Sequence, residues 1–480
     1  MEANNTAHVE SSLLGFTKSI FQSAAPSLVS LIFVPIITFW LWIITSYLSS
    51  PLKKYPGPFL GRFTRLWYMY QVSTGDSHLI LEKLHKKYGP IVRITPSIID
   101  VDIPEIIKSI FNTKDDWLKT PFYHGSSALV SGQIVLNLFS QTDPVKHRKE
   151  RKPIAKFYST AGVTTLEPHI DKVIDQLCGQ LEERFMEGNN FGKICDIGQW
   201  ILFYKNPICH IGPPGFNTIT GISVKHLVDR YQGNDKDYHD PEQPDFLDKF
   251  IEVKNANPEE ADDAQIISWL MVNMIAGADT TAITIRSALY FGLKHPECWQ
   301  RLTDEILAAD FGDEVPAYKH VKGLPYTDAL IREALRMLPG VSMTMERYVP
   351  KEGFTLPNGD FIPGGTILGM NPYILARNKS VYGEDAAVFR PERWLQSDGE
   401  DKQEYEKRLL MMNEADLSFG GGSRICIGKN MGLFQTYKVL ARLITLYEIE
   451  LADPRKEWKV INSWFPRQEG LRVRLRKRVA

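Results

Sequence analysis

A glycine-rich segment near the C-terminal end of the chain carries a single cysteine directly ahead of a predicted helix. Residues 419–428 read FGGGSRICIG, and a helical pattern begins at Lys429. Three consecutive glycines permit backbone conformations and close approaches that side chains would prevent. Cys426 lies just before the helix N-terminus, where the helix dipole and free N–H groups favour a thiolate. A thiolate with no second metal ligand in the segment suits an axial bond to haem iron.

Two other interpretations of this segment stay open at this point. A lone cysteine is often an inert buried thiol, and a glycine-rich loop ahead of a helix is also typical of a phosphate site. The segment lacks the Gly-Lys-Ser/Thr ending of a nucleotide loop, and Ser423 does not stand in a G-x-S-x-G elbow. Arg424, two residues before the cysteine, could donate charge-assisted hydrogen bonds to a haem propionate. The residues therefore favour haem over a nucleotide or a hydrolase.

A second candidate site lies in the middle of the longest predicted helix. This helix spans Asp262 to about Lys294, since the stretch has no proline and begins with acidic residues that suit the positive end of the helix dipole. Its centre is apolar on nearly every face, which predicts a position in the core. Yet residues 276–281 read AGADTT, and an unpaired acid such as Asp279 is costly in a dry interior. The pattern indicates either a notch with a polar end or a helix crossing with a paired aspartate.

The remaining sequence predicts a mainly helical protein with a minor β part. A helical run over residues 79–87 precedes a strand-like stretch over residues 91–101. Over residues 338–366 the pattern becomes irregular and strand-like, with several glycine and proline turn signals. One more helix after Gly428 and short strands complete the chain, in which we find no internal repeat. We interpret residues 61–480 as one domain.

The charge balance and the cysteine count disfavour several classes of protein. The 480 residues include 56 Lys+Arg and 57 Asp+Glu, so the formal net charge is −1 and gives no general attraction to nucleic acid. With 43% hydrophobic and 24% charged residues, the chain is expected to fold rather than remain disordered. Its five cysteines form no zinc or disulfide pattern, which favours a reducing compartment.

The N-terminal region predicts a membrane anchor. Residues 28–48 form a run of about 21 residues without a charge, long enough to cross a bilayer as a helix. Lys53 and Lys54 follow at once, so this flank is expected to stay in the cytoplasm while residues 1–27 form a short lumenal segment. A cleaved signal peptide is the competing interpretation, but the apolar run starts late and is long for one. Two prolines in a Pro-Gly-Pro motif stiffen the predicted hinge over residues 49–60.

The segment around Cys426 resembles the haem-ligand signature of the cytochrome P-450 family of haem-thiolate monooxygenases. The matching positions are Phe419-x-x-Gly422-x-Arg424-x-Cys426-x-Gly428. Four further segments agree in the expected order: the anchor with its Pro-Gly-Pro hinge, residues 276–281, the pair Glu333-x-x-Arg336, and the PERW segment with Arg393. The resemblance implies the P-450 fold, preceded by a single transmembrane helix.

Within that family the chain is similar to fungal members of the pisatin demethylase type. The similarity rests on residues 147–156, 332–337 and 345–350. It implies a fungal source and a terpenoid or polyketide substrate in secondary metabolism.

The resemblance implies how haem would be held. Cys426 would be the thiolate ligand of haem b, with Phe419 packed beside it. Gly422 and Gly428 would let the backbone approach the haem and the sulfur. The residues implied to hold the propionates are Arg424, Arg347, His147 and Arg151. The last two are four positions apart on a predicted helix, so both can face the haem edge.

Two further groups of residues receive roles from the resemblance. Asp279 and Thr280 would relay protons during the reduction of O2, with water as the second product. Glu333, Arg336 and Arg393 would form a buried cluster that supports the cysteine loop and takes no part in catalysis.

The resemblance also implies partners and a location. Electrons would come from NADPH through NADPH–cytochrome P-450 reductase, and the substrate would be a hydrophobic small molecule. The basic run over residues 146–152 could dock the reductase, although such a run is more often a solvated face. The domain would lie on the cytoplasmic side of the endoplasmic reticulum membrane, in contact with lipid and not with nucleic acid. Residues 123–133, residues 339–344 and the turn near Trp464 would line the substrate pocket.

One region departs from the family pattern. Only about 100 residues separate the helix after Pro153 from the long helix at Asp262, and an apolar stretch ending at Tyr204 runs straight into a turn-rich stretch from Lys205. Some tens of residues typical of the family are expected to be missing at this junction, so a catalytically impaired haem-binding chain is one alternative. The other is a reductase-independent haem-thiolate isomerase or dehydratase, which has less need of a proton relay.

Overall fold

Helices make up most of the chain between an N-terminal apolar helix and a C-terminal strand. The computed structural model describes residues 28–130, 133–197 and 216–478. The longer helices are α2 (Leu28–Leu48), α3 (Leu66–Ser73), α4 (Ser77–Tyr88), α6 (Pro144–Arg151), α8 (Glu167–Phe185), α10 (Phe216–Gln232), α11 (Phe246–Ala256), α12 (Asp263–Lys294), α13 (Pro296–Ala308), α15 (Pro325–Met337), α18 (Lys402–Ala415) and α19 (Lys429–Leu446). The shorter helices are α5 (Ile107–Ile110), α7 (Thr160–Thr164), α14 (Tyr318–Lys322), α16 (Pro372–Leu375) and α17 (Lys379–Tyr382).

The β part consists of several small sheets. The largest has the order β1-β2-β9-β6, in which β2 runs parallel to β9 and the other neighbours are antiparallel. Its strands are β1 (Ile91–Arg93), β2 (Ile98–Val101), β9 (Ile367–Met370) and β6 (Met345–Tyr348). A second sheet joins β10 (Tyr447–Leu451), β13 (Arg472–Lys477) and β5 (Cys195–Asp196). The remaining pairs are β11 (Lys459–Asn462) with β12 (Pro466–Glu469), β3 (Ala128–Val130) with β4 (Gln133–Val135), and β7 (Phe354–Thr355) with β8 (Phe361–Ile362). The predicted mainly helical fold with a minor β part is confirmed.

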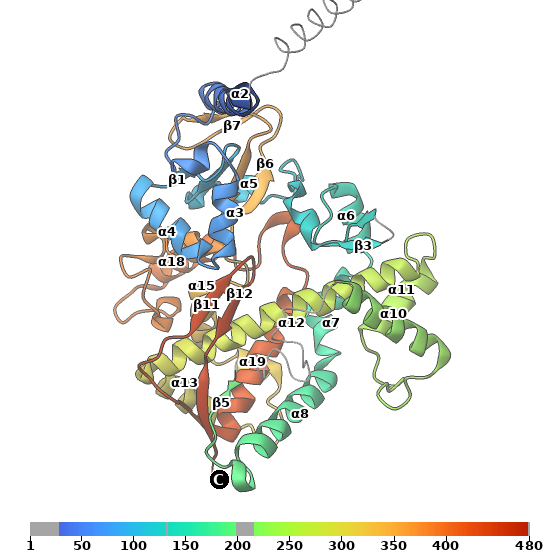
Figure 1. The fold of residues 1–480 in the computed structure, drawn as a ribbon. Helices are drawn as coiled ribbons and strands as arrows, with labels where there is room; N and C mark the ends of the chain where they lie inside the picture. The colour runs from blue at the N-terminus through green and yellow to red at the C-terminus, as the bar shows by residue number, and fades with distance from the viewer. Residues whose placement is uncertain (1–27, 131–132, 198–215, 479–480) are drawn as a thin grey trace, which may run out of the picture.

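Helix α12 crosses the centre of the body (Figure 1). The Asp262 carboxylate caps it by accepting a hydrogen bond from the backbone N–H of Gln265 at 2.8 Å. Every residue over 282–290 is buried, since this half of α12 packs against α13, α15 and α19. The predicted extent of the helix and its place in the core are confirmed.

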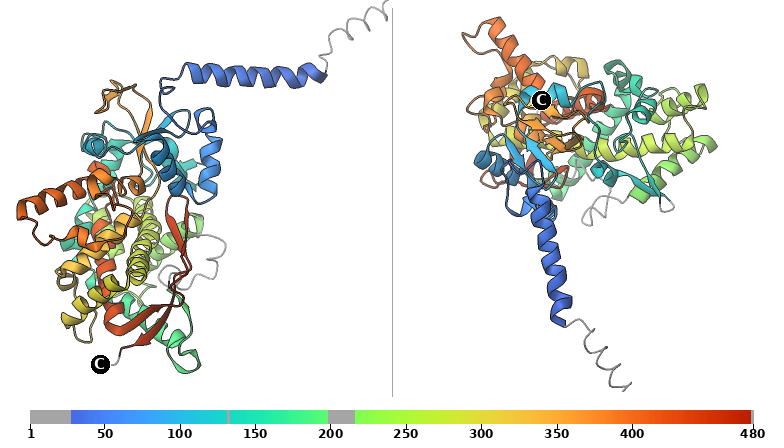
Figure 2. Two further views of the ribbon diagram at one scale, coloured as in Figure 1. Left: turned by 90° about the vertical axis from the view of Figure 1, so that its left-hand side faces the viewer. Right: turned by 90° about the horizontal axis from the view of Figure 1, so that it is seen from above.

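Helix α2 projects away from the body (Figure 2). Most large apolar side chains over Phe33–Leu48 are exposed. Among the described residues, only α12 is long and apolar enough to cross a membrane by length and composition, and it is a core helix of the body. Phe33–Leu48 forms a shorter apolar stretch. The projecting helix is consistent with the predicted anchor.

The chain after α2 is held against strand β1. The backbone N–H of Arg93 donates a hydrogen bond to the carbonyl oxygen of Pro56 at 2.8 Å. A Cβ on Gly57 would lie 2.0 Å from the carbonyl oxygen of Arg93, so this close approach requires glycine. The rings of Tyr47 and Phe63 lie 5.1 Å apart between their centres. These contacts fix the base of α2 against the body.

Candidate active site

The cysteine loop is held by backbone contacts to the segment after α5. Gly422 opens the short helix η8 (Gly422–Arg424) with φ +60°, and a Cβ there would lie 2.2 Å from the carbonyl oxygen of Asn112. The backbone N–H of Ser423 donates to the same oxygen at 3.1 Å. Glycine is therefore required at position 422 because its backbone packs against the backbone of Asn112. This reason differs from the predicted close approach to haem.

Cys426 ends this loop, just ahead of α19. The backbone N–H of Cys426 donates to the carbonyl oxygen of Phe419 at 2.8 Å, and the cysteine side chain is exposed. Burial by the surrounding body nevertheless raises the pKa of the thiol, while the backbone amides of Gly428 and Lys429 and the charge of Arg151 lower it. The backbone amides at the helix N-terminus therefore lower the pKa of Cys426, as the sequence predicts. In the chain without a ligand, the effect of burial on this pKa is larger.

The predicted notch of α12 borders the helix that follows the cysteine. Gly277 and Ala278 are exposed in the middle of α12, and a Cβ on Gly277 would meet nothing within 4 Å. On the first turn of α19, a Cβ on Gly432 would lie 3.4 Å from the hydroxyl oxygen of Thr281. The notch and the helix that starts after Cys426 therefore lie side by side.

Asp279 and Thr280 lie at the polar end of the notch. The Thr280 hydroxyl donates to the carbonyl oxygen of Ala276 at 2.7 Å, within its own helix. Asp279 is partly buried and forms no hydrogen bond or ion pair with the part of the chain that the structure describes. Burial raises the pKa of Asp279, and the charge of Arg286 lowers it. Of the two interpretations of this segment, the notch is the one that fits.

Basic side chains gather beside the cysteine loop. Arg151 Nη1 donates to the carbonyl oxygen of Ile425 at 2.9 Å, and Arg424 Nη1 donates to that of Gln141 at 2.7 Å. We call the group of Lys119, His147, Arg151, Arg347 and Arg424 the cation cluster. None of its members forms an ion pair with a carboxylate in residues 28–130, 133–197 or 216–478. Four members are residues that the sequence proposes as propionate holders, and the structure brings them together.

The cation cluster lacks negative charge. Burial lowers the pKa of Arg424 to about 10, with Asp115 opposing this shift and Arg347 and Arg151 adding to it. Burial and the charge of Arg424 lower the pKa of His147 to about 3, so this histidine is neutral near pH 7. An anionic group placed among these side chains would raise their pKa values again.

Lys119 is the member of the cluster that sequence reasoning misses. Its side chain is buried, and Nζ donates to the carbonyl oxygen of Phe139 at 2.6 Å and lies 4.4 Å from the centre of the Tyr123 ring. Burial and the charges of Arg347 and Arg424 lower the pKa of Lys119 well below its ordinary value. The local signal is a lysine within an aromatic stretch, WLKTPFY, which does not indicate the distant strand that it joins.

Helix α6 carries basic side chains of two kinds. His147 is buried and Arg151 is partly buried, and both face the cysteine loop through their charge interactions with Arg424. Lys146, Arg148 and Lys149 are exposed on the outer side of the same helix. The predicted spacing of four residues therefore directs one pair inward and leaves a basic outer face.

Glu333 on α15 is paired with two arginines, as the sequence predicts. Arg336 Nη2 lies 2.7 Å from Glu333 Oε1, and Arg393 Nε lies 3.3 Å from the same oxygen. Trp394 Nε1 donates to Glu333 Oε2 at 2.9 Å, and the backbone N–H of Arg390 donates to Oε1 at 2.9 Å. The predicted buried cluster of Glu333, Arg336 and Arg393 is confirmed, and we call it the scaffold cluster.

Aromatic side chains from distant segments meet at the predicted pocket wall. The ring centre of Trp464 lies 5.3 Å from that of Phe122, 5.7 Å from Tyr123 and 6.0 Å from Phe139. The backbone N–H of Ser342 donates to the carbonyl oxygen of Trp464 at 3.3 Å. Three segments proposed as pocket walls are therefore in contact, although residues 131–132 of the first lie outside the described residues.

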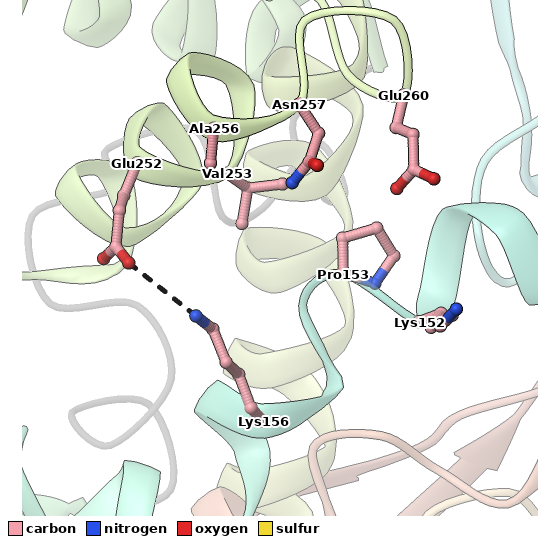
Figure 3. A pocket seen from close by; sticks show the side chains of 8 residues that line it. All are labelled: Lys152, Pro153, Lys156, Glu252, Val253, Ala256, Asn257 and Glu260. Atoms are coloured by element: carbon pink, nitrogen blue, oxygen red, sulfur yellow. Dashed lines mark ion pairs between the residues drawn. The ribbon is translucent and has the colours of Figure 1, made fainter.

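A separate cavity of about 230 Å³ opens between α11 and the short helix η4 (Ala155–Tyr158). Lys156 points across it toward Glu252, with 3.7 Å between Nζ and Oε1 (Figure 3). Its lining residues are Lys152, Pro153, Lys156, Glu252, Val253, Ala256, Asn257 and Glu260. This lining contains neither Cys426 nor the cation cluster, so the cavity is distinct from the candidate active site.

Residues 186–471 match the family model described as Cytochrome P-450. The match covers more than half of the chain and includes the notch of α12, the scaffold cluster and the cysteine loop. The chain belongs to the cytochrome P-450 family. Its fold is therefore the P-450 fold and its activity is that of a monooxygenase, and the phosphate-site interpretation of the glycine-rich loop is excluded.

Curated relatives of this P-450 are fungal enzymes. Cytochrome P-450 monooxygenase cfoH of Aspergillus candidus is 36% identical over 100% of this chain and 97% of the relative. Cytochrome P-450 monooxygenase cicH of Emericella nidulans is 31% identical over 92% of this chain and 97% of the relative. The expectation of a fungal P-450 is confirmed, and the finer resemblance to the pisatin demethylase type stays a prediction.

The relatives also have segments that this chain lacks. The alignment with cfoH spans 529 positions, more than the 480 residues of the chain. A shortened P-450 agrees with the sequence expectation. The junction of Tyr204 and Lys205, where the sequence places the shortening, lies outside the described residues.

The residues of the site fit the haem that the family implies. The cation cluster offers buried donors that are not engaged by any carboxylate in the described ranges. The cysteine loop offers the exposed, free thiol of Cys426, and the notch offers a helix surface at Gly277 where a Cβ would meet nothing within 4 Å. One soft ligand and several donors for carboxylates are what a haem with two propionates requires.

Proposed function

We propose that this P-450 binds haem b through Cys426 and oxidises a hydrophobic small molecule with O2 and with electrons from NADPH. The cation cluster carries this proposal, because buried basic side chains without ion-paired carboxylates need negative charge from a bound group. Arg424, Arg347 and Arg151 would donate charge-assisted hydrogen bonds to the propionates, and Lys119 would add its charge. A bound haem-thiolate supplies the activation of O2.

The notch would supply the protons that this reaction consumes. No residue in the described ranges holds the Asp279 carboxylate by a hydrogen bond or ion pair, so it can exchange protons with solvent and with a neighbouring hydroxyl. Thr280 would receive a proton and pass it on after its hydroxyl turns away from the carbonyl oxygen of Ala276, 2.7 Å distant. Both residues would thereby deliver protons on the side of α12 that Gly277 leaves open.

The ligand assignment is tested by the spectrum of the reduced, CO-treated chain. Cys426→Ala should abolish the red-shifted Soret band of thiolate-ligated haem, because no sulfur then reaches the iron. Cys298→Ala is the matched control, since Cys298 is buried in α13 and should leave the band unchanged. A histidine-type band in the unsubstituted chain, or equal loss of the band in both variants, would contradict the assignment.

The same proposal places this P-450 on a membrane with α2 as its single anchor, its catalytic domain facing the cytoplasm at the endoplasmic reticulum. Support comes from α3 and the segment before it, which expose Phe59, Leu60, Leu66, Met69 and Tyr70 by 57–72%. Residues 49–75 contain four basic side chains and no acidic one. An apolar surface edged with positive charge suits a bilayer with anionic headgroups.

Oxidation of exposed methionines tests this membrane contact. Met69 and Met411 are 63% and 42% exposed, so hydroxyl radicals should oxidise both in the chain freed of lipid. In anionic nanodiscs Met69 should become several-fold slower to oxidise, while Met411 on α18 keeps its rate. Equal rates for both residues in nanodiscs would show that the α3 surface stays in water.

Electron delivery and metabolic role complete the proposal. The exposed face of α6 would dock the acidic surface of NADPH–cytochrome P-450 reductase, a contact that steers by charge and weakens with salt. Fungal relatives and a pocket wall rich in aromatic rings support a terpenoid or polyketide substrate in secondary metabolism.

A further inference from the structure

Arg286 is a buried charge on α12 to which the proposed function gives no role. Its side chain is 2% exposed and forms no ion pair within the described part of the chain. Its Nε donates to the carbonyl oxygen of Ala282 at 3.1 Å, and its Nη1 donates to the backbone carbonyl oxygen of Gln468 on β12 at 3.1 Å. Burial of a guanidinium whose hydrogen bonds go to uncharged oxygens destabilises a fold. A functional role for Arg286 would explain why the charge is present.

The geometry of α12 brings this guanidinium close to Asp279. Seven residues return the helix to within about 20° of its starting direction, so both side chains share one face. The Arg286 side chain runs toward the N-terminus, since its Nε reaches the carbonyl oxygen of a residue one turn earlier. About 5 Å of helix rise then separates the guanidinium from the level of Asp279.

The two charges act on one another. Burial raises the pKa of Asp279, and Arg286 is the charged group that lowers it. Burial lowers the pKa of Arg286 to about 10, and Asp279 and then Asp196 on β5 oppose that shift. Gly340, which abuts the notch, and Gln468, which faces Arg286, are both uncharged. Arg286 is therefore the main source of positive potential at Asp279.

Gln468 holds the guanidinium in place from the neighbouring strand. Its Nε2 donates to the carbonyl oxygen of Ile283 and to the hydroxyl of Ser287, both at 3.0 Å. These two bonds fix β12 along α12 and aim the backbone carbonyl oxygen of Gln468 at Arg286. The direction of the Arg286 side chain is thus set by contacts from two elements.

We propose that Arg286 is a positioning residue that keeps Asp279 ionised by holding a guanidinium one helical turn away on the same face of α12. This inference rests on the proposed role of Asp279 in moving protons at the notch. An ionised carboxylate can accept a proton from solvent and release it toward Thr280, whereas a carboxyl neutralised by burial has no capacity to accept one.

Infrared titration of the full-length chain in nanodiscs tests the inference. The C=O stretch of protonated Asp279 is identified as the band that is lost in Asp279→Asn. Arg286→Gln keeps hydrogen-bond donors but removes the charge, so the midpoint of this band should move to higher pH. Arg286→Lys keeps the charge and should leave the midpoint near that of the unsubstituted chain. Arg442→Met removes a buried arginine from α19 and should also leave it unchanged.

Each outcome has a defined meaning. A band that appears at pH 5 only in Arg286→Gln supports the inference, as does an upward shift in that variant alone. An unchanged midpoint in Arg286→Gln overturns it, and so does an equal shift in Arg286→Lys. If Arg286→Gln does not fold, a midpoint in Arg286→Lys well above that of the unsubstituted chain overturns the inference. The CO spectrum is recorded on the same samples, so failure of the haem-thiolate assignment is recognised separately.

Discussion

Two buried groups of basic side chains lie in the same body and differ in what compensates their charge. In the scaffold cluster, Arg336 and Arg393 face the Glu333 carboxylate at 2.7 and 3.3 Å, and further donors complete its hydrogen bonds. In the cation cluster, the hydrogen bonds that Arg424 and Lys119 donate to the described residues all go to backbone carbonyl oxygens. The first group has its counter-charge within the chain, whereas the counter-charge of the second would come from the propionates of the proposed haem.

The difference follows from the cost of burying charge. A buried ion pair that keeps all its hydrogen bonds roughly breaks even, but a buried charge without a partner destabilises the protein. The pKa values reflect this contrast, since burial lowers that of Arg424 to about 10 while the arginines keep that of Glu333 below its ordinary value. The free-energy cost of burying the cation cluster would be offset by a bound anionic ligand.

Removing the carboxylate of the scaffold cluster should have the largest effect. Glu333→Gln leaves Arg336 and Arg393 buried without an acid, so the free energy of unfolding should fall by about 3–5 kcal/mol. Denaturant unfolding of the haem-free chain measures the change. Glu384→Gln is the control, because its ion pair with Lys379 is exposed and is worth at most about 1 kcal/mol. Similar decreases in the free energy of unfolding in the two variants would show that the buried ion pairs of Glu333 stabilise the chain no more than an exposed pair does.

Removing a member of the cation cluster should act in the opposite direction on the haem-free chain. Lys119→Met deletes a buried charge that has no ion-paired carboxylate among the described residues, so the haem-free chain should melt about 2 °C higher. Haem should leave about tenfold faster, since the positive charge that Lys119 would place near the propionates is lost. Melting and haem transfer to an acceptor protein measure the two effects. Lys149→Met, on the exposed face of α6, should change neither.

If Lys119→Met destabilised the haem-free chain and left haem release unchanged, Lys119 would be a structural residue. The contrast between the two clusters would then rest on the arginines alone.

The two clusters should also make the stability of the haem-free chain depend on pH in opposite ranges, the scaffold cluster in acid and the cation cluster in alkali. Burial alone would raise the pKa of Glu333, but Arg336 and Arg393 outweigh it and lower the pKa below 4.5. Its stabilising contribution is therefore full above about pH 4.5 and is lost as the pH falls through the folded-state pKa. The pKa of Lys119 lies well below 10.5, so the unfolded chain binds more protons and stability rises as the pH climbs toward 10.5.

Melting temperatures of the haem-free chain across this pH range measure both slopes. The acid slope should weaken in Glu333→Gln and the alkaline slope in Lys119→Met. If each variant kept both slopes, the titrating groups would lie elsewhere.

The contrast also separates what the sequence can predict from what it cannot. Glu333, Arg336 and Cys426 belong to short motifs whose members lie within a few residues, so their chemistry is legible locally, and the long helix is marked by its cap and by the absence of proline. Lys119 reaches its site through an isolated bridge to Arg347, and Arg286 gains its place from a strand near the C-terminus. Such pairings depend on the tertiary fold, and no local pattern encodes them.

Substitution on the exposed face of α6 should have the smallest effect on stability. This short helix carries buried and partly buried basic side chains on one side and exposed ones on the other. Arg148 is 65% exposed and pairs with Asp115 at 2.8 Å, so Arg148→Ala should change the free energy of unfolding by less than about 1 kcal/mol and leave haem release unchanged. Its effect should fall on reduction by the reductase, which should slow at low salt and converge with the unsubstituted rate at high salt.

Stopped-flow reduction at two salt concentrations measures this, with Arg301→Ala as the control because Arg301 is 56% exposed and lies on α13. Equal slowing in both variants would indicate a general loss of positive charge rather than a docking face. Slowing by Arg148→Ala alone would support two separate roles for α6. Its buried side would bind the haem propionates, and its exposed side would dock the acidic surface of the reductase.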